Sequence, residues 1–350
     1  MTMTLLRHLA AAIVAAGLLL LLSVKLDAFR DYQLAQVTYY TVAVAGLTIL
    51  IGLSGQLSVG HGAFMFIGAY ATALLLLHAH WPLEAVLAAS AVIAALAGAI
   101  VGVAAARLRG PYLAGATLLL AVALPSITSR WQGVFGGDQG LSVAVNTPGF
   151  LGSTFPPTRW LAWLGFACAL ITFVLLANLR HSRVGRSWRA LRDDEVAASL
   201  SGLNVARLQV LAFVVSSACA GLGGAMLAIV NSSATPGTFA LTLSIQLLTA
   251  AILGGLGSLA GAVWGSLVLV YLAPYITNVA TSHGQSASVG ANIPVVVYGA
   301  VLILVMLVFP DGIQGGLRRL FGPAAPAAAA PFSVLRRHAP VTDNQKEGTL

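Results

Sequence analysis

The residues of this sequence that could do chemistry are few, and nine of its 28 charged side chains lie between positions 180 and 207. This segment reads RHSRVGRSWRALRDDEVAASLSGLNVAR, with six arginines beside Asp193, Asp194 and Glu195. Neither a nucleophile–base arrangement nor HExxH, CxxC or a nucleotide-binding GxxxxGK[ST] motif occurs in the chain. We therefore expect no catalytic residue, no metal site and no cofactor, and we expect these charges to face a partner.

A second group of polar residues lies in the glycine-rich stretch 52–70, GLSGQLSVGHGAFMFIGAY. Gln56, Ser58 and His61 are its polar side chains. Each glycine lowers helix stability by about 1 kcal/mol relative to Ala. Irregular backbone at membrane depth is tolerated only where protein buries it or water reaches it. Two interpretations stay open: a break that lines a transport pathway, or a tight helix–helix contact in which His61 is hydrogen-bonded to a neighbour.

The composition excludes a soluble globular protein. Of the 350 residues 58% are hydrophobic and only 8% are charged, with a mean hydropathy of +0.91. Soluble domains carry about 25% charged residues. From Leu208 to Pro310 there is no Asp, Glu, Lys or Arg, and a membrane span needs about 20 apolar residues. The fold class expected is an all-α polytopic membrane protein.

Two other features have simple explanations. The net charge of +8 comes from loop arginines that set topology and meet anionic lipid headgroups of the bilayer, so no nucleic-acid partner is expected. Cys168 and Cys219 both fall within apolar runs without metal or redox spacing, which indicates buried small residues.

The apolar runs predict about ten transmembrane helices. We expect them near 9–24, 34–53, 83–106, 111–127, 160–179, 208–230, 243–256, 259–276 and 293–309, with one more span that follows the glycine-rich stretch and runs to His78. The first run is short enough for a cleaved signal peptide, but its flank is a poor cleavage site, which favours an uncleaved helix. Glycine-dense segments within 52–78 and 243–276 hint at a duplicated element. Each segment could be re-entrant, which would leave eight spans.

The distribution of Lys and Arg predicts the orientation. Ten spans place both termini on one side, together with most of the arginines, and leave only Lys25, Arg30, Arg130 and Arg159 on the other. The positive-inside rule then puts both termini and segment 180–207 in the cytoplasm. We expect residues 1–320 to form the membrane domain, and residues 321–350, rich in Ala and Pro, to form a disordered cytoplasmic tail.

The spans offer little to drive transport. Pumps and proton-coupled carriers need ionisable groups inside the membrane, and here only Glu84, His61 and His283 come close. A solute moved uphill would therefore need a motor docked on the cytoplasmic side. Segment 180–207 is the expected dock, with a helix over 190–203. A purely topogenic loop would explain its arginines, but it explains the sequence EVAASLSG less well.

Four patches together resemble the permease subunit of bacterial ABC importers for branched-chain amino acids, of the Liv type. They lie between Gly52 and Arg319. The patches are GLSGQLSVGHGAF (52–64), LRGPYLAGATL (108–118), GRSWRALRDDEVAASLSGLNVARLQVLAF (185–213) and SIQLLTAAILGGLGSLAGAVWGS (244–266). The resemblance implies a bacterial inner-membrane subunit that pairs with a second homologous permease, two cytoplasmic ATPase subunits and a periplasmic solute-binding protein.

The resemblance also implies which residues couple the chain to its ATPase. The family's Glu-Ala-Ala…Gly helix falls on Glu195, Ala197, Ala198 and Gly202, with Val196 as an extra residue. The coupling residues expected are Arg189, Arg192, Asp193, Asp194, Glu195, Ala197, Ala198 and Gly202.

The solute is less well defined. At 135–141 the sequence FGGDQGL carries Phe135 where many amino-acid permeases carry Thr, a feature similar to urea and short-amide permeases. A sugar or nucleoside permease, a stand-alone channel and a secondary carrier also stay open. For an amino acid, we expect helix N-termini to hold the carboxylate and apolar walls the side chain. The pathway candidates are Gln56, Ser58, His61, Tyr112, Asp138 and Gln139.

Overall fold

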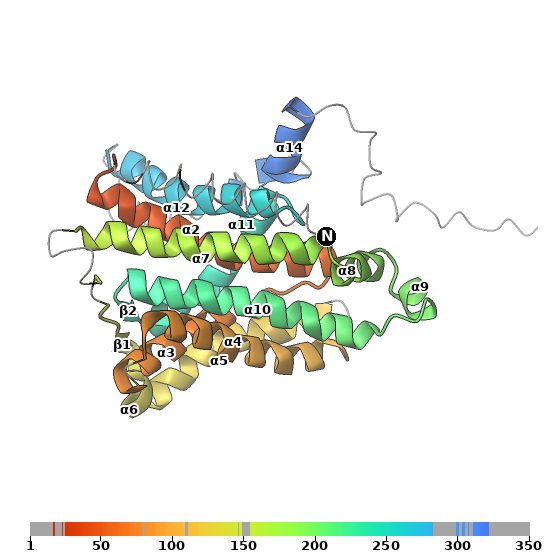
Figure 1. Cartoon of the computed structure of the whole chain (residues 1–350), viewed down its shortest axis with the longest axis horizontal. Coiled ribbons are helices and arrows are strands. Elements are labelled where there is room, and N and C mark those ends of the chain that lie inside the picture. Colours follow the sequence, from red (N-terminus) through yellow and green to blue (C-terminus); the bar gives the residue numbers. More distant parts are fainter. Residues whose placement is uncertain are drawn as a thin grey trace, which may run out of the picture.

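The computed structural model describes residues 17, 23, 25–79, 81–108, 111–145, 147–148, 155–282, 299–300, 303–304, 307 and 311–321. Within these residues the fold is almost entirely helical (Figure 1). The helix expected over 9–24, most of the span expected over 293–309, and the tail after 321 lie outside the described residues.

The long helices follow the apolar runs of the sequence. They are α2 (Ala28–Ser54), α4 (Leu83–Ala105), α5 (Pro111–Arg130), α7 (Pro157–His181), α10 (Val205–Val230) and α12 (Leu259–Ser282). Two shorter apolar helices are α3 (His61–Leu74), which a π-helical turn (Leu75–Ala79) extends, and α11 (Leu241–Gly254). Proline opens α5 at the expected position, because the first turn of a helix needs no N–H donor there.

Five helices of the described chain are long and apolar enough to cross a membrane by length and composition. They are α2, α3 with its π-helical turn, α4, α7 and α10. A sixth span results if α5 is counted with the turns over 132–139, from which it is bent by 92°. This confirms a helical, polytopic membrane protein, whereas the count of ten spans stays a prediction.

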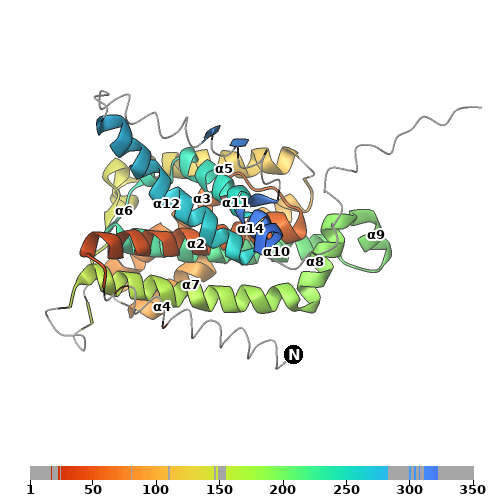
Figure 2. The same cartoon turned by 90° about the horizontal axis from the view of Figure 1, so that it is seen from above.

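Helices α2 and α10 form the centre of the bundle. In Figure 2, α2 lies between α5 and α11 on one side and α7 and α4 on the other, and α10 packs against α2, α3 and α4. Small residues let these backbones approach: a Cβ added to Gly224 of α10 would lie 1.9 Å from Met65 O of α3. Without a hydrophobic driving force between helices in lipid, such close packing is what holds them together.

One end of the bundle is closed by a compact loop. After α5 the chain forms α6 (Gln132–Phe135), a 3-10 turn (Gly137–Gln139) and β1 (Leu141–Ser142), which pairs antiparallel with β2 (Ser233–Ala234). Phe66 of α3 stacks near Tyr70, and Tyr70 contacts Phe135 edge-on with ring centroids 5.6 Å apart. The loop predicted between 130 and 158 is therefore folded down onto α3 where it is described.

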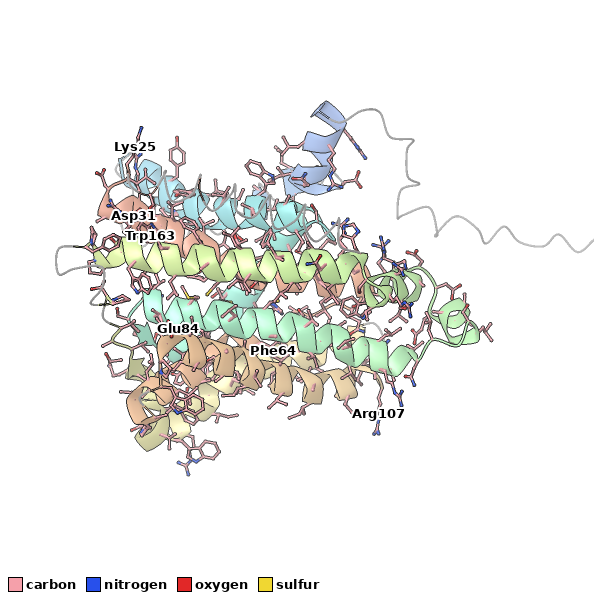
Figure 3. The ribbon with its side chains drawn as sticks, in the orientation of Figure 1. Lys25, Asp31, Phe64, Glu84, Arg107 and Trp163 are labelled. Atoms are coloured by element: carbon pink, nitrogen blue, oxygen red, sulfur yellow. The ribbon has the colours of Figure 1, made fainter. Side chains whose placement is uncertain are left out.

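The same end carries a buried ion pair. Arg159 Nε lies 3.3 Å from Asp31 Oδ2, and the Asp31 side chain is fully buried. Figure 3 shows Lys25, Asp31 and Trp163 at this end and Arg107 at the opposite one. The other end also bears the charged helices α8 (Arg183–Asp193) and α9 (Glu195–Leu200) (Figure 1). The last described helix, α14 (Gly312–Phe321), contacts α11 and α12.

The close approach of α10 and α3 can be tested at Gly224. Replacing Gly224 with Ala forces the two backbones apart, so we expect the free energy of unfolding to fall by about 1–3 kcal/mol. A Cβ on Gly115 of α5 would meet nothing within 4 Å, so Gly115→Ala is the matched control and should not destabilise the protein. Thermal unfolding in detergent compares the two variants. A Gly224→Ala protein as stable as its parent would contradict this packing.

Candidate functional site: the charged helices and the glycine-rich breaks

The charged segment folds into two helices rather than one. The single helix expected over 190–203 is wrong, because Asp194 has extended backbone (φ −158°, ψ 111°) and separates α8 from α9. Its Oδ1 accepts hydrogen bonds from Val196 N at 2.8 Å and Ala197 N at 3.0 Å. Asp caps helix N-termini well since its side chain replaces missing intrahelical partners, and this local preference decides the break.

Helix α8 is packed onto the bundle by its apolar side. Trp188 is fully buried, and its Nε1 donates to Leu208 O at 2.9 Å on α10. Leu191, one turn further on, is also buried. α8 contacts α2, α7 and α10. A tryptophan buried to this extent fixes the helix in place, so α8 is a part of the bundle and not a free loop.

Arg192, in the last turn of α8, points towards α2. Its Nη1 donates to Gly52 O at 2.6 Å, while Nε and Nη2 lie 3.3 and 3.1 Å from Asp193 Oδ1. Arg192 therefore makes an internal contact, whereas Asp193 is largely exposed. Arg189, on the same helix, is half-buried.

Helix α9 presents an apolar surface to solvent. Val196 and Leu200 are 67% and 83% exposed, and Ala197 is exposed beside them, whereas Ala198 is buried. We call Val196, Ala197 and Leu200 the α9 patch. The helix ends at Leu200, and Gly202 in the turn that follows has φ +82° and no atom within 4 Å of an added Cβ. Glu195, in the first turn, is half-buried. An exposed apolar pair at a polar end of the molecule is typical of a protein contact.

The first glycine-rich break returns into the bundle. Between α2 and α3 the chain has no regular secondary structure over 55–60, and His61 Nε2 donates to Ala43 O at 3.1 Å. Ala43 lies about three turns before the end of α2, so α3 begins deep among the helices. Gly62 N donates to Ser244 Oγ at 3.0 Å in the first turn of α11. The N-terminal ends of α3 and α11 therefore meet inside the bundle.

Three predicted pathway residues come together at this break. Gln56, Ser58 and His61 are buried. Among the described residues, the Gln56 amide oxygen and nitrogen, Ser58 Oγ and His61 Nδ1 have no hydrogen-bond partner. Buried polar atoms without a partner are rare and call for an explanation. Each of the two interpretations of the sequence finds one matching feature here. The hydrogen bond of His61 to a neighbouring helix fits a helix–helix contact, and the unsatisfied polar atoms of the same segment fit a transport pathway.

The other three pathway candidates lie apart from this group. Tyr112 is 77% exposed near the start of α5, and Asp138 and Gln139 are exposed on the turn at the opposite end of the bundle from α9. Two residues of this region were not predicted: Thr117, whose Oγ1 accepts from Val59 N at 3.1 Å, and Ser244. Only their polarity within apolar runs could have signalled them.

Comparison with known proteins bears on this arrangement. Residues 29–306 match the family model described as branched-chain amino acid transport system / permease component. The chain belongs to this family. No solved structure gives a significant match.

Within this permease family the chain is similar to several curated proteins. It is 32% identical over 254 residues to the permease protein LivM of the high-affinity branched-chain amino acid transport system of Escherichia coli K12, covering 66% of this chain and 60% of that relative. It is 30% identical over 305 residues to the LivH permease protein of Salmonella typhimurium, covering 79% and 91%. The ribose import permease protein RbsC of Escherichia coli K12 is 30% identical over 250 residues, covering 68% and 74%.

The cap of α9 can be tested at Asp194. Asp194→Ala removes the acceptor of two N–H groups, so we expect the local stability of α9 to fall by about 1 kcal/mol and the amides of Val196 and Ala197 to exchange hydrogen several-fold faster. Asp194→Asn keeps an acceptor and should resemble the parent. Hydrogen–deuterium exchange of the purified protein measures this difference. Equal exchange in the parent and the alanine variant would show that the cap does not hold α9.

Proposed function

We propose that the chain is the membrane-spanning permease subunit of an ABC importer that moves branched-chain amino acids across the bacterial inner membrane. It would pair with a second homologous permease, receive solute from a periplasmic binding protein, and be driven by two ATPase subunits on its cytoplasmic side. The observation that carries this proposal is the pair α8–α9, a charged unit with an apolar patch at one end of an otherwise apolar bundle.

The α9 patch is the proposed contact with the ATPase. Val196 and Leu200 offer apolar anchors, and Asp193, Asp194 and Glu195 directly precede them in the chain and add negative charge. Interfaces combine such a small apolar centre with a polar rim. Ala198 would hold α9 on the bundle, and Gly202 would let the chain turn back into α10. ATP hydrolysis itself would belong to the partner, because the chain has no nucleotide-binding motif of the GxxxxGK[ST] type.

The proposed pathway runs past the first glycine-rich break. The N-terminal ends of α3 and α11 carry partial positive charge, which favours a carboxylate, and broken helices at membrane depth serve this purpose in other transporters. Gln56, Ser58 and His61 would supply further hydrogen bonds once the site opens. Tyr112 on α5 and the exposed turn with Asp138 and Gln139 would lie at its two mouths.

The proposed topology has ten spans with both termini and residues 321–350 in the cytoplasm. It is supported by the charges at the two ends of the bundle. Lys25 and the Asp31–Arg159 pair lie at one end, whereas Arg107 and α8–α9 lie at the other. The RbsC relative favours a sugar as the second candidate solute, and the sequence FGGDQGL keeps urea or a short amide as a third.

The coupling role predicts an effect of charge in the α9 patch. In the transporter assembled from this chain and its partners, we expect leucine to stimulate ATP hydrolysis. Val196→Asp with Leu200→Asp should reduce both ATPase binding and this stimulation by more than tenfold, because two buried charges would have no partner. Ala190→Asp places the same charge at an exposed site on α8 and is the control.

Three outcomes would contradict different parts of the proposal. Assembly and stimulation that survive the double substitution would remove the docking role of α9. Stimulation of ATP hydrolysis by ribose or urea in place of leucine would keep the proposed ABC importer but change its solute. Transport by the purified chain in liposomes without ATP would instead establish a channel or a secondary carrier.

The topology predicts which ends of the bundle are open to the cell exterior. Cys168 and Cys219 are buried, so an introduced cysteine can be labelled against a low background. Gly133→Cys adds a thiol in open space on α6, and Ser199→Cys adds one on exposed α9. A membrane-impermeant maleimide should label position 133 in intact cells and position 199 only after permeabilisation. The reverse pattern would invert the whole orientation.

A further inference from the structure

The contact between Arg192 and Gly52 O is made at the end of a broken helix. The last four carbonyls of a helix lack intrahelical partners. α2 ends with Gly55 in the left-handed conformation (φ +74°), where Gly55 N donates to Ile51 O and Gln56 N to Leu50 O. Arg192 Nη1 donates to Gly52 O in this last turn at 2.6 Å. A cation at this position also complements the negative end of the helix dipole.

Gly52 touches the second glycine-rich break as well. A Cβ on Gly52 would lie 2.1 Å from Gly257 N and 2.5 Å from Gly257 Cα, in the connection between α11 and α12. A Cβ on Gly55 would lie 2.9 Å from Arg192 Cγ. We call Gly52, Gly55 and Gly257 the glycine junction. Two interrupted membrane elements and the last turn of α8 therefore meet there without any intervening side chain.

The Arg192 side chain is itself 46% exposed, and its neighbour Asp193 faces solvent beside it. Asp193, which accepts from Arg192 Nε and Nη2, has a side chain that is 67% exposed. One turn earlier, Trp188 of α8 is hydrogen-bonded to Leu208 O of α10. A movement of the outer end of α8 therefore reaches α2 through the charge-assisted hydrogen bond of Arg192 with Gly52 O. Asp193 orients the guanidinium of Arg192 for this bond. Such hydrogen bonds are about twice as strong as neutral ones.

We propose that Arg192 is a positioning residue that transmits displacement of the charged helices to the glycine junction, and so to the two breaks that meet there, 55–60 between α2 and α3 and 255–258 between α11 and α12. This inference rests on the proposed function in that the displacement comes from a docked ATPase. It differs from docking, because Arg192 binds a carbonyl of its own chain. Loss of Arg192 should leave the partner bound and separate ATP hydrolysis from transport.

Three variants test this role. Arg192→Ala removes the contact, and Arg192→Lys keeps one cationic donor for Gly52 O but loses the planar fork that also binds Asp193. Arg183→Ala removes the same charge from the exposed start of α8, away from the glycine junction and the α9 patch, and is the matched control.

Two measurements apply to each variant. Hydrogen–deuterium exchange of the full chain in nanodiscs reports on the Gly55 and Gln56 amides, which should exchange about tenfold faster in Arg192→Ala, as expected for loss of one charge-assisted hydrogen bond. In the assembled transporter, leucine imported per ATP hydrolysed should fall at least tenfold in Arg192→Ala with the ATPase still bound. Arg192→Lys should recover part of both effects, and Arg183→Ala should match the parent.

The alternatives give different results. Normal exchange and normal leucine import in Arg192→Ala would overturn the inference, and so would loss of the bound ATPase in that variant, which would make Arg192 a docking residue. An equal effect of Arg183→Ala would show that only the total positive charge of α8 matters, and it would overturn the inference too. If the parent protein itself imports no leucine, the proposed function fails, and the exchange measurement alone then decides whether Arg192 controls the glycine junction.

Discussion

Every N–H and C=O group that lies among apolar helices must find a partner inside the protein, and this constraint shapes the chain more than any other. Continuous helices meet it by themselves, but α3 and α11 begin within the bundle, where their first N–H groups have no preceding turn. Ser244 supplies an acceptor for one such group, and Thr117 supplies one for the loop before α3. At the end of α2 the partner is Arg192. Interrupted helices are thus satisfied by single polar side chains from distant positions.

The centre of the bundle meets a different demand. α2 and α10 are buried among other helices, and α10 approaches its neighbour closely, as at Gly224. Contacts of this kind are specific, because one added methyl group on Gly224 already collides with Met65 O. The rigid centre made by α2 and α10 is bordered by short elements with glycine at their ends. The structure therefore combines a fixed core with places where the backbone can bend.

Much of this fold follows from the sequence, because uncharged apolar runs of sufficient length have one stable state in lipid. The ends of α4, α10 and α5 lie within a few residues of the expected ones. The break at Asp194 was not predicted, since a helix-compatible composition hides the preference of one aspartate for a cap. The contact of Gly62 in the first turn of α3 with Ser244 was not predictable in detail either. It depends on a chain reversal whose depth is fixed by the contact of His61 with Ala43, which lies on another helix.

The exposed apolar pair on α9 has a consequence for the life of the protein in the cell. Val196 and Leu200 are exposed to water on a short helix. A newly inserted copy of the chain therefore exposes the apolar α9 patch until a partner covers it. Surplus copies would be natural targets for membrane proteases and prone to cluster with one another. The chain then persists in the membrane only if the partner that covers the α9 patch is synthesised in a matching amount.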